Sequence, residues 1–410
     1  MSITGVLIFG LSYVLISARK LPWLGFDRPA GALLGAVLCV ATRVLTPGAA
    51  LAAVDGGTLL LLFGMMGMGA FLGADGFFDQ LEARLTRWAK SPVRLLALIV
   101  WGAGALSALI TNDAVCVLGA PLVVRLIQRQ RLPALPFLLA LATGANTGSV
   151  ATLVGNPQNM LCGLLGGLRY REHLVLLLPV AVLGLALNQA LLAALFRDAL
   201  SQARLDPGGE EVPPLARRTW LTLLVIGGSV LVYLLGGHLA WTAAGGFVAL
   251  MLLRREDTSE LWGRIDWALL VFFSALFVVV QGLTASGAPA ALFARFPLAA
   301  GGDSFMGWLR LSAIFLVGSN LVSNVPFILV VRDQMATLND PRLGWEVLTL
   351  ASTFAGNLTL LGSVANIIVA EAGRSVGGIG FWQYLRVGLP LTLVTTLLGV
   401  TWLLAVSGRL

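Results

Sequence analysis

Charged side chains are scarce in this chain of 410 residues. Asp, Glu, Lys and Arg make up 11% of it, whereas 58% of the residues are hydrophobic. A soluble domain carries about 25% charged residues, so a large soluble core would lack the polar surface that it needs. Apolar runs of roughly 17–25 residues, the length of a membrane-spanning helix, recur along the whole sequence. The composition therefore predicts an all-α polytopic membrane protein.

Residues that carry enzyme chemistry are equally scarce. The chain has two histidines and three cysteines, and it has no Gly-x-Ser-x-Gly, HExxH or ATP-binding-loop motif. We therefore expect no enzyme, no cofactor and no primary pump in this chain alone, although a partner ATPase stays open. Cys116 and Cys162 lie near the polar residues described below, where a soft ligand site for arsenic is conceivable. Ordinary buried cysteine is the simpler interpretation.

Basic residues outnumber acidic ones, 27 to 20, which gives a formal net charge of +7. No run of five or more like charges occurs, so the charge indicates no nucleic-acid partner. If the N-terminus lies outside, the larger share of the basic residues falls in loops on the cytoplasmic side, as the positive-inside rule requires. We therefore expect a multi-pass protein of the cell inner (cytoplasmic) membrane, in contact with lipid, with the N-terminus and the C-terminus outside.

What the chain does have is an internal repeat. Thr152-Leu153-Val154-Gly155-x-x-x-Asn159 returns as Thr359-Leu360-Leu361-Gly362-x-x-x-Asn366, at an offset of 207 residues, and Thr111-Asn112 returns as Ser323-Asn324, at an offset of 212. Asp55 matches Asp266, Gly76 matches Gly287, Gly166-Gly167 matches Gly377-Gly378 and Pro179 matches Pro390. Two homologous halves with polar, glycine-broken sequence inside apolar stretches are typical of secondary transporters. We expect a first repeat at 1–197, a cytoplasmic linker at 198–217 and a second repeat at 218–410.

Each half is predicted to hold five transmembrane helices and one re-entrant hairpin, and an odd number of crossings turns the second half upside down. In the first half, helices are expected at about 3–17, 29–45, 56–73, 134–165 and 173–196, an amphipathic stretch at 77–90 and a hairpin at 93–125. In the second half, helices are expected at about 219–236, 238–253, 266–283, 346–370 and 381–406, an amphipathic stretch at 288–296 and a hairpin at 305–332. The fourth helix of each half is expected to be broken near the midplane.

The hairpins are inferred from arm length. In the first half, Thr111-Asn112-Asp113 joins apolar arms at 95–110 and 114–124. At 1.5 Å per residue the second arm reaches only about 16 Å, half of a bilayer core. Basic residues flank both outer ends, so the polar tip should stop at mid-membrane, where protein or water must cover it. Two full transmembrane helices with a polar turn are the alternative, but the second half has the same layout.

The two hairpin tips and the two helix breaks are expected to form one site. Glycine and proline free backbone groups at the breaks, asparagine, serine and threonine add neutral donors and acceptors, helix N-termini suit anions, and freed carbonyls suit Na⁺. The alternative is that these polar residues only hold helices together in lipid. The candidate substrate-binding or ion-binding residues are Thr111, Asn112, Asp113, Asn146, Thr152, Gly155, Asn156, Asn159, Ser323, Asn324, Asn357, Thr359, Gly362, Ser363 and Asn366.

Asp113 is the acidic residue placed well inside an apolar stretch near a tip. An intramembrane carboxylate indicates function: it could bind H⁺, bind Na⁺ or act as a countercharge. The alternative is a capping role at the start of the second hairpin arm. Val325 stands at the matching position of the second half, so the two half-sites are unequal. Asp55 and Asp266 open equivalent helices, where capping is the better explanation.

At these residues the chain resembles the ion transporter superfamily, which includes divalent-anion/sodium symporters, citrate transporters, and ArsB-type arsenite and NhaD-type antiport permeases. The resemblance covers nearly the whole chain. In the dicarboxylate symporters both tips are Ser-Asn-Thr and bind Na⁺ and the substrate carboxylate. Here Asn112 and Asn324 match, while Asp113 and Val325 depart from that pattern. Asn112-Asp113 with Gly155-Asn156-Pro157-Gln158-Asn159 is nearer to the arsenite and antiporter branches, or to their anion-permease relatives.

The resemblance implies a homodimer in which a scaffold domain carries an elevator-like transport domain. The expected function is secondary active transport of a small inorganic or organic anion, or of a neutral oxyacid such as arsenous acid, coupled to H⁺ or Na⁺. Sodium could bind at Asn112, Asp113 and Asn159. Arsenite efflux and Na⁺/H⁺ antiport remain alternatives, and a channel is a further one.

Overall fold

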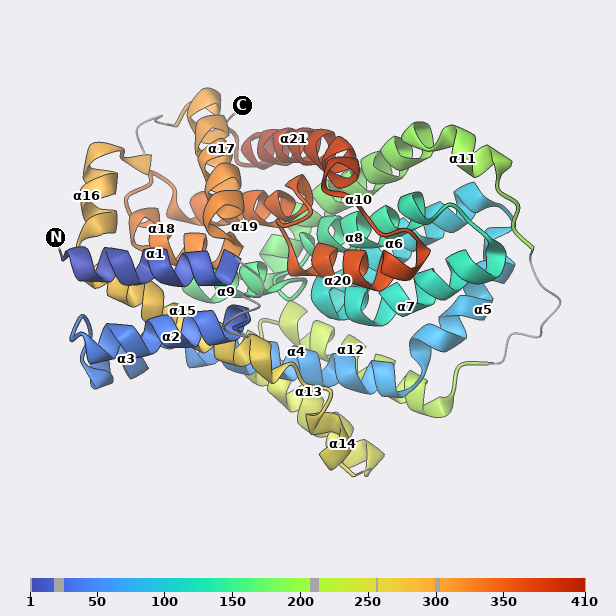
Figure 1. Ribbon diagram of the computed structural model, residues 1–410, viewed down its shortest axis with the longest axis horizontal. Helices are drawn as coiled ribbons and strands as arrows, with labels where there is room; N and C mark the ends of the chain where they lie inside the picture. Colours follow the sequence, from blue (N-terminus) through green and yellow to red (C-terminus); the bar gives the residue numbers. More distant parts are fainter. Residues whose placement is uncertain (1, 18–25, 207–213, 256, 299–302, 410) are drawn as a thin grey trace.

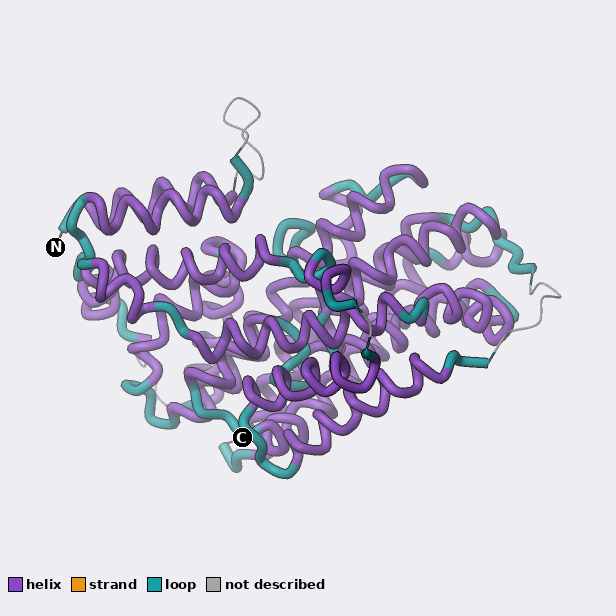
Figure 2. The backbone as a smooth tube through the Cα atoms, turned by 90° about the horizontal axis from the view of Figure 1, so that it is seen from below, coloured by secondary structure: helices purple, strands orange, loops and turns teal. Residues whose placement is uncertain are grey.

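The computed structural model describes residues 2–17, 26–206, 214–255, 257–298 and 303–409, and the regular elements in these ranges are helices (Figures 1 and 2). Seven of them are long and apolar enough to cross a membrane: α4, α6, α10, α12, α15, α17 and α21. The shorter apolar helices α1, α2 and α13 add to these. The predicted all-α, polytopic fold class is confirmed.

The helices of the first half follow the predicted order. Their bounds are α1 Ile3–Ser17, α2 Arg28–Ala41, α3 Pro47–Ala53, α4 Gly56–Ala74, α5 Phe77–Ala89, α6 Pro92–Leu109, α7 Asn112–Gln130, α8 Ala134–Ser149, α9 Pro157–Leu165, α10 Tyr170–Leu195 and α11 Arg197–Gln202. The predicted broken helix is the pair α8 and α9, and the predicted hairpin is the pair α6 and α7. The short helices α3 and α11 were not expected.

The second half has the same succession. Its helices are α12 Arg217–Leu234, α13 Leu239–Arg254, α14 Ser259–Trp262, α15 Trp267–Ala285, α16 Ala288–Arg295, α17 Phe305–Val322, α18 Asn324–Met335, α19 Pro341–Leu358, α20 Val364–Ala372, the 3₁₀-helix η2 Gly373–Val376 and α21 Phe381–Val406. The hairpin is α17 with α18, and the broken helix is α19 with α20. The boundaries of the two repeats stay a prediction. Residues 207–213 of the predicted linker lie outside the described residues.

Two predicted boundaries were wrong. The second arm of the first hairpin does not end near residue 124, because α7 continues to Gln130. Arg125 in this extension pairs with Asp79 at 2.6 Å and with Glu82 at 2.8 Å on α5, which holds the added turns in place. Helix α19 begins at Pro341, before the predicted residue 346, because the Asp340 side chain caps it by accepting the backbone N–H of Leu343.

The helices pack into two groups, the support group and the site group. The support group is α1–α4, α12, α13 and α15, in which α4 packs on α13 and α15 packs on α1 and α2. The site group is α6–α10 and α17–α21, in which α8 packs on α6 and α7, and α19 packs on α17 and α21. The two groups meet chiefly where α4 contacts α9 and where α15 contacts α18 (Figure 1). Smaller contacts join α12 to α6 and α10, and α4 to α7. Both hairpins and both broken helices therefore belong to one packing unit.

Candidate functional site

The two helix breaks are held by equivalent hydrogen bonds. In the first, the Asn159 side-chain Nδ2 donates to the carbonyls of Ser149 at 3.0 Å and Thr152 at 2.9 Å. In the second, Asn366 Nδ2 donates to the carbonyls of Gly356 at 2.7 Å and Thr359 at 3.1 Å. Each of these contacts recurs at the same offset of 207 residues. The asparagine after each break thus satisfies carbonyls that the end of the preceding helix leaves without partners.

Each hairpin tip is bonded to the break of its own half. The backbone N–H of Asn112 donates to the Gly155 carbonyl at 2.9 Å, and Asn324 Nδ2 approaches the Gly362 carbonyl at 3.5 Å. The break also donates back: the Thr152 hydroxyl bonds to the carbonyl of Ala108 at 2.8 Å. These bonds place the tips in the protein interior, where re-entrant backbone can be satisfied.

In the second half, the acceptor of the equivalent threonine hydroxyl is a side chain instead of a backbone carbonyl. The Thr359 hydroxyl donates to Asn320 Oδ1 at 3.0 Å, and Asn320 lies at the position equivalent to Ala108. The sequence analysis missed Asn320, because its partner in the first half contributes only a backbone carbonyl. Both threonine hydroxyls, expected to donate to a solute, donate to the protein in this structure.

Glycine is required at both breaks by close approach of the backbone. A Cβ atom on Gly155 would lie 2.1 Å from the Ser149 carbonyl oxygen, and one on Gly362 would lie 2.8 Å from that of Ala355. Both residues therefore act through the shape of the break, which lets the carbonyls of residues 155 and 362 face the tips.

Asn146 joins the two halves. Its Oδ1 accepts from Asn112 at 2.8 Å and from the Ser363 hydroxyl at 3.2 Å, and its Nδ2 donates to Asn357 at 3.1 Å and Asn366 at 2.8 Å. Asn146 is only 2% exposed. One buried amide thus contacts the first tip and three predicted residues of the second half.

Thr353 is the equivalent of Asn146 in the second half, again at an offset of 207 residues, and the sequence analysis missed it. Its hydroxyl donates to Asn159 Oδ1 at 2.6 Å and accepts from Asn156 Nδ2 at 3.1 Å. The side chains at these equivalent positions differ, so the repeat could not be recognised there from residue identity. The offset alone was the available signal.

A cavity of about 260 Å³ opens beside the two tips. The predicted residues on its wall are Asn112, Asp113, Ser323, Asn324, Gly362 and Ser363. Arg28, Gln158, Ser319 and Asn320 line it as well, and the sequence analysis did not include them among the candidates. We call this space the tip cavity.

Four helices begin at the tip cavity. Residues of the first turn of α7, α9, α18 and α20 line it: Asn112 and Asp113, Pro157 and Gln158, Asn324 and Val325, and Val364. Helix N-termini carry partial positive charge, so four of them around one space favour an anion or an oxygen-rich solute.

The other predicted residues lie away from the cavity wall. Asn146, Asn156, Asn159, Asn357 and Asn366 are buried in the hydrogen-bond network beneath it, and Thr152, Gly155 and Thr359 shape the breaks. Thr111 caps α7, where its hydroxyl accepts the backbone N–H of Ala114 at 3.2 Å. The structure therefore separates the candidates into residues of the wall and residues that hold the wall.

Asp113 lies beside a helix of the other half. Its carboxylate faces the backbone N–H of Ala365, in the first turn of α20. Ser363, the N-cap residue of α20, makes no side-chain cap of its own, whereas Asn156 caps α9 by accepting the N–H of Asn159 at 2.8 Å. The expected capping role at the start of α7 is filled by Thr111, and Asp113 lies on the wall of the tip cavity.

Asp113 also borders a second cavity of about 460 Å³, lined by α4, α7, α20 and residues 263–269. Arg264 and Asp266 stand on its wall. The Asp266 carboxylate accepts the N–H of Leu269 at 2.9 Å, and that of Asp55 accepts the N–H of Thr58 at 2.6 Å, so the capping interpretation of both is confirmed. Asp113 lies between the two cavities.

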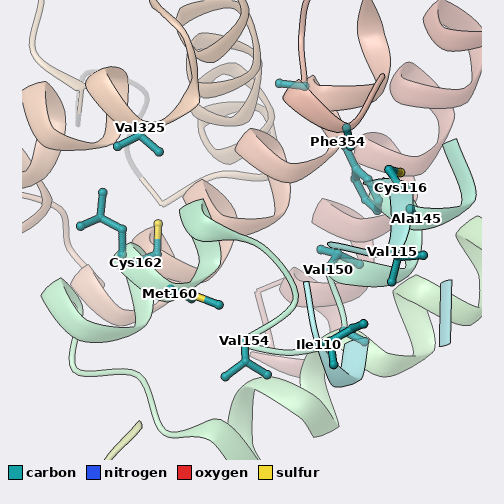
Figure 3. Packing of buried hydrophobic residues seen from close by; sticks show 14 of the residues in the cluster. Ile110, Val115, Cys116, Ala145, Val150, Val154, Met160, Cys162, Val325 and Phe354 are labelled. Carbon is teal, nitrogen blue, oxygen red and sulfur yellow. The ribbon is translucent and has the colours of Figure 1, made fainter. Parts of the chain in front are cut away.

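The cysteines do not form a shared site. Cys116 and Cys162 are fully buried, and Figure 3 places them apart, Cys162 on α9 and Cys116 on α7. Within the described residues, no group of three or more His, Cys, Asp and Glu side chains is placed to hold a metal ion. Their packing matches the simpler interpretation of buried apolar cysteine.

The comparison with known proteins supports a transporter. The sequence profile of the citrate transporter family matches residues 13–355. The silicon efflux transporter LSI3 of Oryza sativa subsp. japonica is 32% identical, over 97% of this chain and 96% of its own length. A 46 kDa membrane protein of Mycobacterium leprae is 26% identical, over 98% of both chains.

A solved structure has the same fold. The YdaH transporter of Alcanivorax borkumensis, described as having an unusual topology, aligns with a TM-score of 0.52 over 98% of this chain and 96% of its own, at 18% identity. The family match, the relatives and the fold agree with the expected resemblance to the ion transporter superfamily. The chain is a multi-pass membrane transporter and belongs to the citrate transporter family.

Proposed function

We propose that this protein is a secondary active transporter that moves a small anion or a neutral oxyacid through the tip cavity. The observation that carries the proposal is the convergence of four helix N-termini on that cavity, two from each half. The partial positive charge of these N-termini, with the side chains of Asn112 and Asn324 on the wall, suits a solute whose surface consists of oxygen atoms.

The size and charge of the cavity favour a small solute. A space of about 260 Å³ is below the range of roughly 300–1,000 Å³ that drug-sized ligands occupy. Among the described residues, one guanidinium, from Arg28, and one carboxylate, from Asp113, stand on its wall, so the charges of these two side chains cancel. The silicon efflux relative points in the same direction, since dissolved silicon is the neutral oxyacid Si(OH)₄ near neutral pH.

The Asp113 carboxylate is the group we assign to coupling. It contacts both cavities, so it can exchange H⁺ or Na⁺ with either. An ionisable group at this depth is costly to bury, and its presence there therefore indicates a function. Asn112 could share a sodium ion with it. Asn159, the third predicted sodium ligand, uses its amide to bind the break and Thr353, so its part in that site would require the break to rearrange.

The packing supports an elevator-type movement in the inner membrane. Both tips and both breaks belong to the site group, which meets the support group at α4 with α9 and at α15 with α18. Motion of one group against the other would carry both tips and both breaks with their hydrogen bonds intact, and would change the part of the cavity wall that α1, α2 and α15 supply. We further propose a homodimer, with the N-terminus and the C-terminus outside, in line with the superfamily and the positive-inside rule.

The proposal can be tested by measuring solute-evoked currents on proteoliposomes adsorbed to a solid support. Silicic acid, arsenite, citrate, succinate, sulfate and phosphate would be applied in turn, each with Na⁺ or with a pH step. We expect a saturable current that is lost in Asn112→Ala. A current from Na⁺ or a pH step alone, lost in Asp113→Asn, with silence to every solute, would instead make the protein a Na⁺/H⁺ antiporter. Conductance without saturation or gradient coupling would indicate a channel.

A further inference from the structure

His173 and Glu346 form a buried pair away from the tip cavity. His173 lies in the first turn of α10 and is 0% exposed, and Glu346 lies in the second turn of α19 and is 2% exposed. Nδ1 of the imidazole lies 2.7 Å from Glu346 Oε2, and Nε2 lies 3.2 Å from the carbonyl oxygen of Val150. The ring therefore stands between a carboxyl group and the end of α8.

Both neighbours of the ring are oxygen acceptors, and this determines how many protons the pair holds. The Val150 carbonyl can only accept, so a hydrogen bond to it requires a proton on Nε2. A proton must then also lie between Nδ1 and Glu346, either on the imidazole as a cation or on the carboxyl group. Either arrangement holds one proton more than a neutral histidine beside a carboxylate. With both hydrogen bonds formed, the pair contains one dissociable proton.

Loss of that proton breaks one of the two bonds. The one remaining proton on the ring would satisfy the buried carboxylate at Nδ1, because an uncompensated buried charge is the costlier alternative. Nε2 would then turn a lone pair toward the Val150 oxygen, and that contact would become repulsive. Glu346 Oε1 has no hydrogen-bond partner among the described residues, so the carboxyl group has no second donor to stabilise its charge.

We propose that His173 and Glu346 are a proton-binding site that controls the first helix break. Val150 follows Ser149, the last residue of α8, and the carbonyls of Ser149 and Thr152 hold Asn159. Proton release breaks the hydrogen bond from His173 Nε2 to the Val150 carbonyl, and proton binding restores it. The transport part of this inference rests on the proposed function. It assigns H⁺ a second site, separate from Asp113.

Few other ionisable groups surround the pair. The thiol of Cys162, on α9, faces Glu346, and Tyr170 begins α10 beside Thr152 of the break. At the ends of the same helices, Glu172 pairs with Arg342 and with Arg169, and Asp340 pairs with Arg409 at 3.2 Å. These charges are already in ion pairs of their own. Glu172, one residue from His173 but 35% exposed at its side chain, offers a matched control.

Infrared difference spectroscopy of the purified protein tests proton binding without any transport. Spectra would be recorded across a pH titration for the wild type, Glu346→Gln, His173→Gln and Glu172→Gln. We expect one buried carboxyl–imidazole transition in the wild type and in Glu172→Gln, absent from Glu346→Gln and from His173→Gln. The two variants serve as independent checks if one of them fails to fold. A titration unchanged in both would overturn the proposal.

Proteoliposome flux tests the link to transport. The rate of silicic acid or arsenite movement would be measured with and without a pH gradient, and the ratio of the two rates compared, so that a general loss of rate does not imitate the effect. Glutamine at position 346 can donate to Nδ1 without a dissociable proton, so we expect the ratio to fall to about one in Glu346→Gln and to stay at the wild-type value in Glu172→Gln. A wild-type ratio in Glu346→Gln would contradict the link. Failure of the wild type to move any solute would count against the proposed function, while the infrared result would still decide the proton site.

Discussion

The two half-sites have the same order of tip and break, but their helices are capped differently. In the first, Thr111 caps α7 and Asn156 caps α9 with their own side chains. In the second, Ser323 precedes α18 without a side-chain cap, and Ser363 precedes α20 without one. The first turns of α7 and α9 are therefore capped by side chains of their own half, whereas those of α18 and α20 have no such cap.

Residues of the first half lie against the uncapped end of α20. The Ser363 hydroxyl donates to Asn146, and the Asp113 carboxylate faces the first turn of α20. Ser323 has φ of 70°, a strained value for a residue with a side chain, whereas Thr111 at the same place has φ of −135°. The comparison teaches that a repeat can keep its backbone plan while one copy comes to depend on the other. We expect the second half-site to be the more mobile.

The largest effect is expected at Asn146. Asn146→Ala removes four hydrogen bonds, three of them between the halves, and buried polar groups left without partners cost about 1–3 kcal/mol each. Solute transport should fall by at least about 100-fold, since 1.4 kcal/mol corresponds to a factor of ten. Thr353→Ala, the equivalent change with two bonds, should lose about tenfold on the same scale. Equal losses in a flux assay would contradict the central position of Asn146.

Two substitutions at Asp113 separate the charge of its side chain from its polarity. Asparagine keeps a polar side chain beside the N-terminus of α20 but cannot be a carboxylate, so Asp113→Asn should keep the stability of the protein and lose the dependence of transport on an H⁺ or Na⁺ gradient. Asp113→Ala should lose both, with a decrease of about 1 kcal/mol in the free energy of unfolding. Flux ratios and thermal stability would be measured for both variants. Gradient dependence that survives in Asp113→Asn would remove Asp113 from coupling.

Alanine substitutions at the two break glycines should lower the stability of the protein by different amounts. A Cβ atom meets backbone oxygen at 2.1 Å on Gly155 and at 2.8 Å on Gly362, so Gly155→Ala should destabilise by about 2–3 kcal/mol and Gly362→Ala by about 1 kcal/mol. Gly102 in α6 has open space around it, so Gly102→Ala is the matched control. Thermal unfolding followed by size exclusion would rank the three. A Gly362→Ala variant less stable than Gly155→Ala would contradict the geometry.

The smallest effect is expected at the strained tip. Ser323→Gly should relieve the positive φ and stabilise the protein by about 1 kcal/mol, with little change in transport. Thr111→Gly, at the relaxed equivalent, should destabilise by a few tenths of a kcal/mol because a cap is lost. The comparison of the two melting temperatures measures the strain directly, and a destabilised Ser323→Gly would show that the hydroxyl matters more.

Much of the fold could be predicted from the sequence, because membrane helices are recognised by long apolar runs and because the breaks contain glycine, proline and asparagine. The hairpins and broken helices were found in both halves. The short helices α3 and α14 were missed, because seven and four residues give too little periodicity to recognise. The end of α7 was misplaced, because its last turns depend on ion pairs with α5 that local sequence does not reveal.

The site was predicted in part. Tips and breaks could be matched by residue type, so six of the predicted residues lie on the cavity wall, namely Asn112, Asp113, Ser323, Asn324, Gly362 and Ser363. Asn320 and Thr353 were missed because their equivalents, Ala108 and Asn146, are of another type. Arg28 and the pair of His173 with Glu346 were missed because each reaches its neighbours through contacts between segments far apart in the sequence. Roles that depend on which helices pack together require the structure.

The most direct test of the central claim is an experimental structure with a bound solute. Arsenite is suited to this, because its arsenic atom can be located by anomalous scattering; any solute that evokes a current could replace it. Our account predicts density in the tip cavity, in contact with Asn112 and Asn324 and facing the first turns of α7, α9, α18 and α20. Density in the second cavity beside Arg264, with the tip cavity empty, would contradict it.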